Sequence, residues 1–208
     1  MTLAHPRALV LREKDLNFKT YMNYAIKCNT ICHTNGTKML LHGLDLAAAD
    51  YLYALLLASC APKNQELLFD GIQLSMKDFL WARDHVPREI FETLKKRGFV
   101  IGVSTHTVAE AAVCEERGAD FITASHIFPT DCKKGLPPRG LGYLQDVCDT
   151  VSLPVYALGG INETNADFCT RAGASGVCVM SLCMESSAAR RLKTIISMGS
   201  HLRTSVLK

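Results

Sequence analysis

The feature that most constrains the fold of this chain is a repeated alternation between short apolar runs and longer segments with helical periodicity. The apolar runs predict strands at residues 8–11, 39–41, 71–74, 100–103, 121–124, 155–158 and 176–180. Helical patterns between and after them cover residues 18–30, 47–59, 88–97, 107–117, 141–150, 162–171 and 186–198. Strands that alternate with helices form parallel sheets with right-handed crossovers, so the sequence predicts an α/β fold.

Two architectures are compatible with this alternation, an open doubly wound sheet and a closed (β/α)8 barrel. The first apolar run is not followed by a Gly-x-Gly-x-x-Gly turn, which disfavours a dinucleotide-binding open sheet. A glycine pair, Gly159-Gly160, follows the second-last run. Barrels of this kind bind phosphate in the loops after their last two strands, so the pair favours a (β/α)8, TIM-barrel-like fold.

The chain contains seven predicted strands rather than the eight of a complete barrel. Residues 1–6 stand directly before the first apolar run and resemble the end of a helix. We therefore expect a barrel that lacks its first strand and most of its first helix. The chain length of 208 residues suits a single domain, over residues 1–208.

Composition narrows the class of protein. The net charge is only +3 and no long run of like charges occurs, so we expect neither a nucleic-acid nor a membrane partner. The longest apolar region, residues 52–61, is too short to span a bilayer. The 9 cysteines are an odd number, and with no Cys-x-x-Cys pair and no export signal they predict a reducing, cytoplasmic location.

Polar side chains gather where the fifth predicted strand ends. His126 follows the run 121–124 closely, and Thr130, Cys132 and Lys133 stand on the loop after it. Parallel α/β folds place their chemistry on such loops, and histidine is the side chain whose ordinary pKa suits proton transfer near neutral pH. Ser104 occupies the corresponding place after the fourth predicted strand, where it either contacts a ligand or caps the next helix.

Two later strand ends predict a phosphate site. The run 155–158 leads into Gly159-Gly160 and then into a predicted helix start at Asn162 to Asn165, while the run 176–180 ends at Met180 and is followed by Ser181. Glycine lets the backbone approach an anion closely, and a helix start directs free N–H groups toward it. We therefore expect these two strand ends to bind a phosphate group.

Several of these segments together resemble the thiamine phosphate synthase/TenI superfamily. The resemblance lies in Leu-Val-Leu-Arg-Glu-Lys at 9–14, Gly-Ala-Asp-Phe-Ile at 118–122, Ser-His-Ile-Phe-Pro-Thr-Asp-Cys-Lys-Lys-Gly at 125–135, Val-Tyr-Ala-Leu-Gly-Gly-Ile at 155–161 and Gly-Ala-Ser-Gly-Val-Cys-Val-Met-Ser at 173–181. It implies a (β/α)8 barrel, with the family's first strand absent here. It also implies a thiazole phosphate, a small molecule, as the ligand.

The superfamily has a synthase branch and a thiazole tautomerase (TenI) branch, and this chain resembles the tautomerase branch more closely. Its pattern His-x-Phe-x-Thr-Asp-Cys-Lys-Lys-Gly matches residues 126–135, and its Gln-Leu matches 73–74. The resemblance implies an isomerase of thiamine biosynthesis that moves a proton on a carboxythiazole phosphate, without metal or redox cofactor. It casts His126 as the general acid/base. The residues implied to hold the substrate are Arg12, Lys14, Ser104, Thr130, Cys132, Lys133, Gly159, Gly160, Met180 and Ser181, with Lys133 and Arg12 facing the carboxylate.

Two alternatives remain open. A thiamine phosphate synthase, which joins a pyrimidine diphosphate to a thiazole phosphate, would need Mg²⁺. The acids that serve this metal in synthases are replaced here at 41–43 and 74–77, and Val10 stands in place of a glutamine. The third alternative is a non-catalytic binder of thiazole phosphate. A homo-oligomer is compatible with all three, and the insertion at 46–69 either packs on the outside of the barrel or contacts a partner.

Overall fold

The computed structural model describes residues 6–13, 15–43, 55 and 67–184. The chain divides into two compact units, one formed by Arg7–Gly102 and the other mainly by Val103–Lys208. The strand pairs resolved within each unit are parallel, and helices connect successive strands. The predicted α/β class is therefore confirmed.

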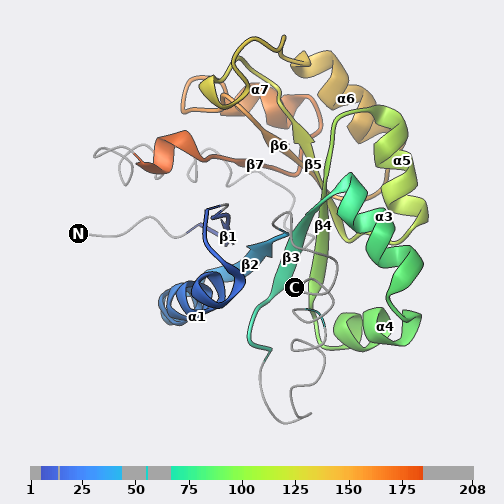
Figure 1. Ribbon diagram of the computed structural model, residues 1–208. Coiled ribbons are helices and arrows are strands. Elements are labelled where there is room, and N and C mark those ends of the chain that lie inside the picture. Colours follow the sequence, from blue (N-terminus) through green and yellow to red (C-terminus); the bar gives the residue numbers. More distant parts are fainter. Residues whose placement is uncertain (1–5, 14, 44–54, 56–66, 185–208) are drawn as a thin grey trace. The chain divides into compact units, whose positions relative to one another are not determined.

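The unit Arg7–Gly102 holds three neighbouring strands in sequence order. They are β1 (Ala8–Leu11), β2 (Lys38–His42) and β3 (Gly71–Ser75). Helix α1 (Phe18–Thr34) connects β1 to β2 and contacts β2 (Figure 1). Helices α3 (Met76–His85) and α4 (Arg88–Lys96) follow β3, and β4 (Val100–Thr105) begins at the end of this unit.

Among the described residues of this unit, helix α3 is the element that the sequence did not predict. It begins after Ser75, whose hydroxyl oxygen accepts the N–H of Asp78 at 3.2 Å. Only Phe79 and Ala82 of the helix are buried. Such a narrow apolar stripe is a weak periodic signal over ten residues, so the N-cap rather than the hydrophobic pattern defines this helix.

The second unit continues the alternation. Its elements are the end of β4, α5 (Val108–Glu116), β5 (Phe121–Ser125), the short helix η1 (Asp131–Lys133), α6 (Gly140–Thr150), β6 (Val155–Leu158), α7 (Ala166–Arg171), β7 (Gly176–Cys178) and the short helix η2 (Ser181–Met184). Strands β5, β6 and β7 are neighbours in that order. Helix α6 contacts α5 and β6, and α7 contacts β7 (Figure 1).

Most predicted strands lie where the apolar runs placed them, and seven strands occur in the described part of the chain. The largest differences in bounds are that the helix predicted at 18–30 ends at Thr34, that the helix predicted at 162–171 begins at Ala166, and that the strand predicted at 176–180 ends at Cys178. The predicted helices at 47–59 and 186–198 lie outside the described residues, except for Leu55, which is helical and buried. No described helix combines the length and the hydropathy needed to cross a membrane.

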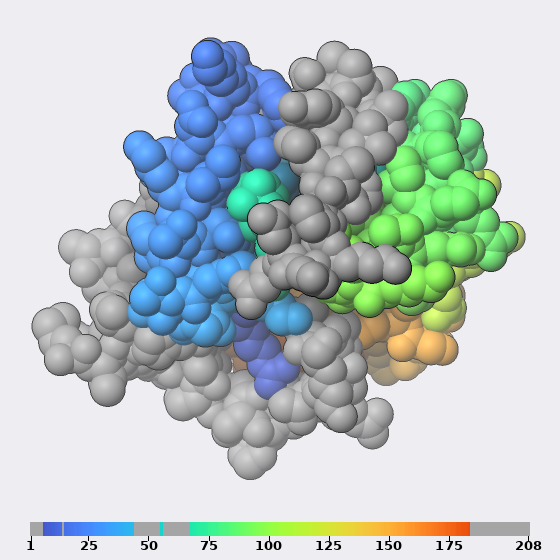
Figure 2. Space-filling model, turned by 90° about the horizontal axis from the view of Figure 1, so that it is seen from below, coloured from blue at the N-terminus to red at the C-terminus, as the bar shows by residue number. Residues whose placement is uncertain are grey.

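Each unit buries its own apolar side chains. In Arg7–Gly102 the fully buried set includes Met39, Leu74 and Phe79, and in the second unit it includes Val103 and Ile122. The outer surface of α1 is different, because Tyr24 and Ile31 are 51% and 65% exposed. In Figure 2 the surface of α1, in blue, is uncovered.

Tyr21 lies on the buried side of α1. Its hydroxyl donates to the carbonyl oxygen of Leu11 at 3.0 Å and lies 3.4 Å from that of His42, so one phenol contacts the carboxyl ends of β1 and β2. Burial is the main cause that raises the pKa of Tyr21 well above the usual value of about 10. The phenol therefore stays protonated and keeps donating at neutral pH.

We expect Tyr21→Phe to lower the free energy of unfolding by about 1 kcal/mol, because a buried carbonyl loses its donor. Tyr24→Phe, on the exposed side of the same helix, should leave it nearly unchanged. The advantage of wild type over Tyr21→Phe should be full below about pH 10 and should shrink above it, because the unfolded phenol ionises first. Denaturant titrations of the three proteins at pH 8 and pH 11 measure this. Equal losses in the free energy of unfolding for Tyr21→Phe and Tyr24→Phe would contradict this role of the Tyr21 hydroxyl.

Candidate active site

The carboxyl ends of β5, β6 and β7 lie side by side. Their register pairs Ser125 with Leu158, and Leu158 with Cys178. The residues that follow these positions, among them His126 and Gly159, therefore lie along one edge of the sheet. This edge is where parallel α/β folds place binding and catalytic groups.

Gly159 packs directly against His126. A Cβ atom on Gly159 would lie 2.4 Å from the Cβ of His126 and 2.9 Å from its Cα, and the φ of Gly159 is +104°. Main-chain bonds hold the two segments together, because Ile127 N–H donates to Leu158 O at 3.0 Å and Phe128 N–H donates to Gly159 O at 3.0 Å. Only glycine fits this position, and its first role is to let the His126 segment approach β6.

Gly160 is also enclosed by backbone, since a Cβ there would lie 2.3 Å from the carbonyl oxygen of Pro129. Its own carbonyl accepts the side-chain amide of Asn165 at 2.9 Å, and the side-chain oxygen of Asn165 accepts Asn162 N–H at 2.8 Å. Of the predicted helix start at Asn162 to Asn165, only its last residue precedes the helix directly, because residues 163–165 form a turn before α7 begins and the side chains of Asn162 and Asn165 bond within this segment.

A cavity of about 340 Å³ opens beside His126. Its lining consists of His106, His126, Lys133, Leu136, Pro137, Pro138 and Arg139. This lining holds two permanent cations and two histidines and has no carboxylate. A cavity of this size and charge suits a small anionic molecule.

His126 is one of the residues that line this cavity and is only 6% exposed. Its Nε2 atom is buried and has no hydrogen-bond partner among the described residues. Leaving a buried polar atom unpaired costs about 1–3 kcal/mol. The acid/base role of His126 stays a prediction.

His106 is a cavity residue that the sequence reasoning did not select. Its Nδ1 lies 2.9 Å from the carbonyl oxygen of Ser125. Since a carbonyl only accepts, Nδ1 carries the proton, and Nε2 of the neutral ring is an acceptor. Thr107 and Glu110 form a capping box at the start of α5, and Glu110 also accepts His106 N–H at 2.5 Å. The pattern Thr-x-x-Glu at 107–110 is the signal in the sequence that could have shown that the chain is fixed just before α5.

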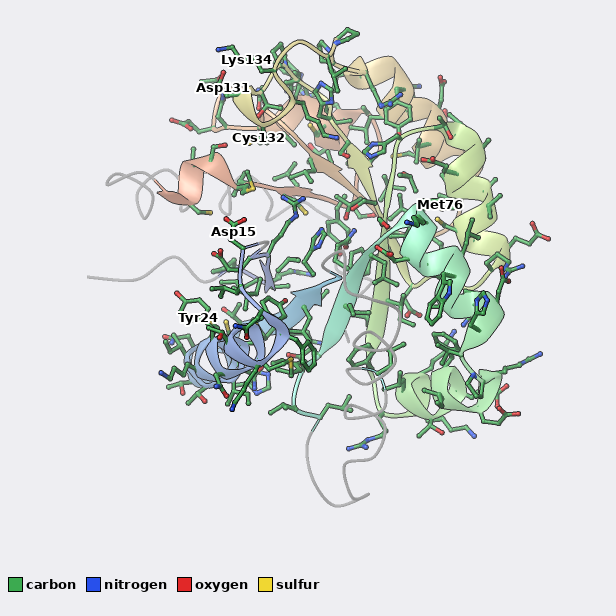
Figure 3. All side chains as sticks on the ribbon, viewed as in Figure 1. Asp15, Tyr24, Met76, Asp131, Cys132 and Lys134 are labelled. Atoms are coloured by element: carbon green, nitrogen blue, oxygen red, sulfur yellow. The ribbon has the colours of Figure 1, made fainter. Side chains whose placement is uncertain are left out.

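Other predicted residues lie around the same edge. Lys133 lines the cavity, and Thr130 directly precedes η1. The Sγ atom of Cys132 lies 3.9 Å from the hydroxyl of Ser181, which brings the loop after β5 close to the segment after β7. Figure 3 labels Asp131, Cys132 and Lys134 on this loop. Lys134 does not line the cavity.

The remaining predicted residues are less closely tied to the cavity. Ser104 is half-buried in β4, and Met180 is 48% exposed just after β7. Arg12 follows β1 in the unit Arg7–Gly102 and is exposed, while Lys14 lies outside the described residues. The binding roles given to these residues stay predictions.

Buried cysteines behave as apolar groups. Burial raises the pKa of Cys114 to about 12 and that of Cys169 to about 11, so both remain thiols at neutral pH. Within the described ranges, no group of three His, Cys, Asp or Glu side chains could hold a metal ion. Asp78, the nearest acid to the altered synthase motif, accepts the hydroxyl of Ser75 at 2.5 Å.

Comparison with known proteins identifies relatives over most of the chain. Residues 2–183 match a family described as thiamine monophosphate synthase. A thiamine-phosphate synthase from Methanocella arvoryzae is 40% identical over 133 residues, which are 62% of this chain and 59% of that protein. One from Coprothermobacter proteolyticus is 28% identical over 194 residues, covering 91% of this chain and 81% of that protein.

A solved structure supports the fold class. The thiamine phosphate pyrophosphorylase from Pyrococcus furiosus matches 95% of this chain and 84% of its own, with a TM-score of 0.70 and 22% identity. At this identity the likeness establishes the fold alone, and it confirms the predicted TIM-barrel-like α/β class.

We expect Gly159→Ala to lower the free energy of unfolding by about 3 kcal/mol or more, because strain at positive φ adds to overlap with His126. Gly98→Ala is the matched control, since Gly98 has a φ of +81° and nothing within 4 Å of the added Cβ. It should cost only about 1–2 kcal/mol. Chemical denaturation of both variants checks this, and a Gly159→Ala loss no larger than that of Gly98→Ala would contradict the packing role.

Proposed function

The chain belongs to the thiamine monophosphate synthase family, and on that premise we propose that it is an enzyme of thiamine biosynthesis that binds a thiazole phosphate beside His126. The observation that carries this proposal is a cavity whose lining offers lysine, arginine and two histidines to an anion and no carboxylate. Phosphorylated ring compounds have the size and charge for such a cavity.

The names of the relatives favour one reaction of the family. Both curated relatives are called thiamine-phosphate synthase, and none of the comparisons described above names a tautomerase. Joining a pyrimidine diphosphate to a thiazole phosphate is therefore the first candidate reaction. The relatives support it better than they support the tautomerase that the motif at 126–135 predicts.

Magnesium would serve the synthase reaction by neutralising diphosphate. The described residues fit this ion poorly, because the acids of the synthase motifs are replaced at 41–43 and 74–77 and the carboxylate of Asp78 accepts the hydroxyl of Ser75. The described residues therefore do not match the metal requirement of the synthase reaction that the names of the relatives suggest.

The second candidate is the thiazole tautomerase reaction, and the environment of His126 favours it. Moving a proton from one position of the substrate ring to another leaves the oxidation state unchanged and needs only a group that accepts and returns a proton. His126 is the residue type that most often does this, it lines the cavity, and its Nε2 has no partner among the described residues. Lys133 supports the reaction by offsetting negative charge on the bound substrate.

One experiment separates the candidates. The purified protein is incubated with carboxythiazole phosphate, and conversion to the aromatic tautomer is followed. In parallel it is incubated with thiazole phosphate, pyrimidine diphosphate and Mg²⁺, and thiamine phosphate is measured. Binding of thiazole phosphate with neither product would identify a non-catalytic binder.

If the tautomerase reaction occurs, we expect His126→Gln to lower kcat by about 10²- to 10⁴-fold, the usual contribution of a general acid/base. His85→Gln is the control, because His85 is exposed on α3 and is not part of the cavity lining. Thermal unfolding of both variants shows whether they fold. A folded His126→Gln protein with wild-type kcat would contradict the assigned role.

A further inference from the structure

Arg139 is a cavity residue to which the sequence reasoning gave no role. Its main chain is tied to that of His126, because Arg139 N–H donates to His126 O at 3.0 Å. The next residue repeats this pattern, since Gly140 N–H donates to Ile127 O at 3.1 Å. These two bonds keep Arg139 at a fixed place relative to the proposed acid/base residue.

The side chain of Arg139 is oriented by an aromatic ring. The guanidinium carbon lies 5.6 Å from the centre of the Tyr143 ring, within the range of a cation–π contact. The Tyr143 hydroxyl donates to the carbonyl oxygen of Thr105 at 3.2 Å, which anchors the ring to the end of β4. Burial raises the pKa of Tyr143, so the hydroxyl remains protonated and the anchor persists at neutral pH.

The guanidinium has no carboxylate partner within the described part of the chain, and the cavity lining contains neither aspartate nor glutamate. An oriented guanidinium presents several N–H donors in one plane, and this geometry matches the two oxygens of a carboxylate. Lysine, as at Lys133, offers a single point charge instead.

We propose that Arg139, held by Tyr143, binds the carboxylate of the substrate ring and selects carboxylated over non-carboxylated thiazole phosphates. This inference rests on the proposed binding of a thiazole phosphate beside His126. It adds the residue that recognises the carboxylate, the second anionic group of the substrate. Lys133 then neutralises charge without setting the geometry.

The test measures dissociation constants by calorimetry for two compounds, carboxythiazole phosphate and the same thiazole phosphate without the carboxylate. We expect Arg139→Gln to weaken binding of the carboxylated compound by about 10- to 100-fold, the usual worth of charge-assisted hydrogen bonds. Binding of the other compound should change by less than about threefold.

Two further variants test the orientation of the guanidinium. Tyr143→Leu removes the ring and should weaken binding of the carboxylated compound selectively, by about 3- to 10-fold. Tyr143→Phe keeps the ring and should weaken this binding less. Lys134→Gln is the matched charge control, because it removes a cation from the same loop but not from the cavity lining. It should affect the two compounds equally and weakly. Thermal unfolding of each variant establishes that it folds.

Different failures point to different errors. Equal weakening of both compounds by Arg139→Gln would overturn the inference, since Arg139 would then serve the phosphate or the fold. A loss no larger than that of Lys134→Gln would overturn it too, because long-range charge would explain the effect. If folded wild-type protein bound neither compound, the proposed function would fall and this inference with it.

Discussion

The close approach of the His126 segment to Gly159 is the contact on which the candidate site depends. Two main-chain bonds, from Ile127 and Phe128 to the end of β6, extend the pairing of β5 and β6 beyond the last residue of either strand. This extension needs a position without a Cβ on the facing chain, and Gly159 supplies it. The main chain at His126 is consequently held by hydrogen bonds that continue the sheet.

Much of the fold could be predicted from the sequence because burial imposes a strong pattern. The run at 121–124 lies within β5, whose five residues are all buried, because parallel strands that are buried on both faces are largely apolar. Helix α3 escaped prediction because it buries only Phe79 and Ala82. The start of α7 was misplaced because Asn162, a good N-cap type, instead bonds within a turn closed by Asn165.

The candidate site was predictable only in part, for a physical reason. A motif identified His126 and Lys133, both of which line the cavity. His106 and Arg139 were missed because their roles depend on partners distant in sequence, the carbonyl oxygens of Ser125 and His126. The sequence analysis predicted that the pair Gly159-Gly160 helps to bind a phosphate. In the structure both glycines pack closely against the segment after β5. Sequence alone does not distinguish a packing role from a phosphate-binding role.

Asp70 connects three strands of the unit Arg7–Gly102 through its side chain and its main chain together. Its carboxylate accepts Met39 N–H at 2.8 Å and contacts His33 Nε2 at 2.9 Å. Its own N–H donates to Met39 O, and its carbonyl accepts Val100 N–H, each at 2.9 Å. Asp70 therefore links the amino ends of β2, β3 and β4. Its exchange would remove the side-chain contacts with Met39 and His33, while the main-chain bonds to Met39 and Val100 do not depend on the side chain.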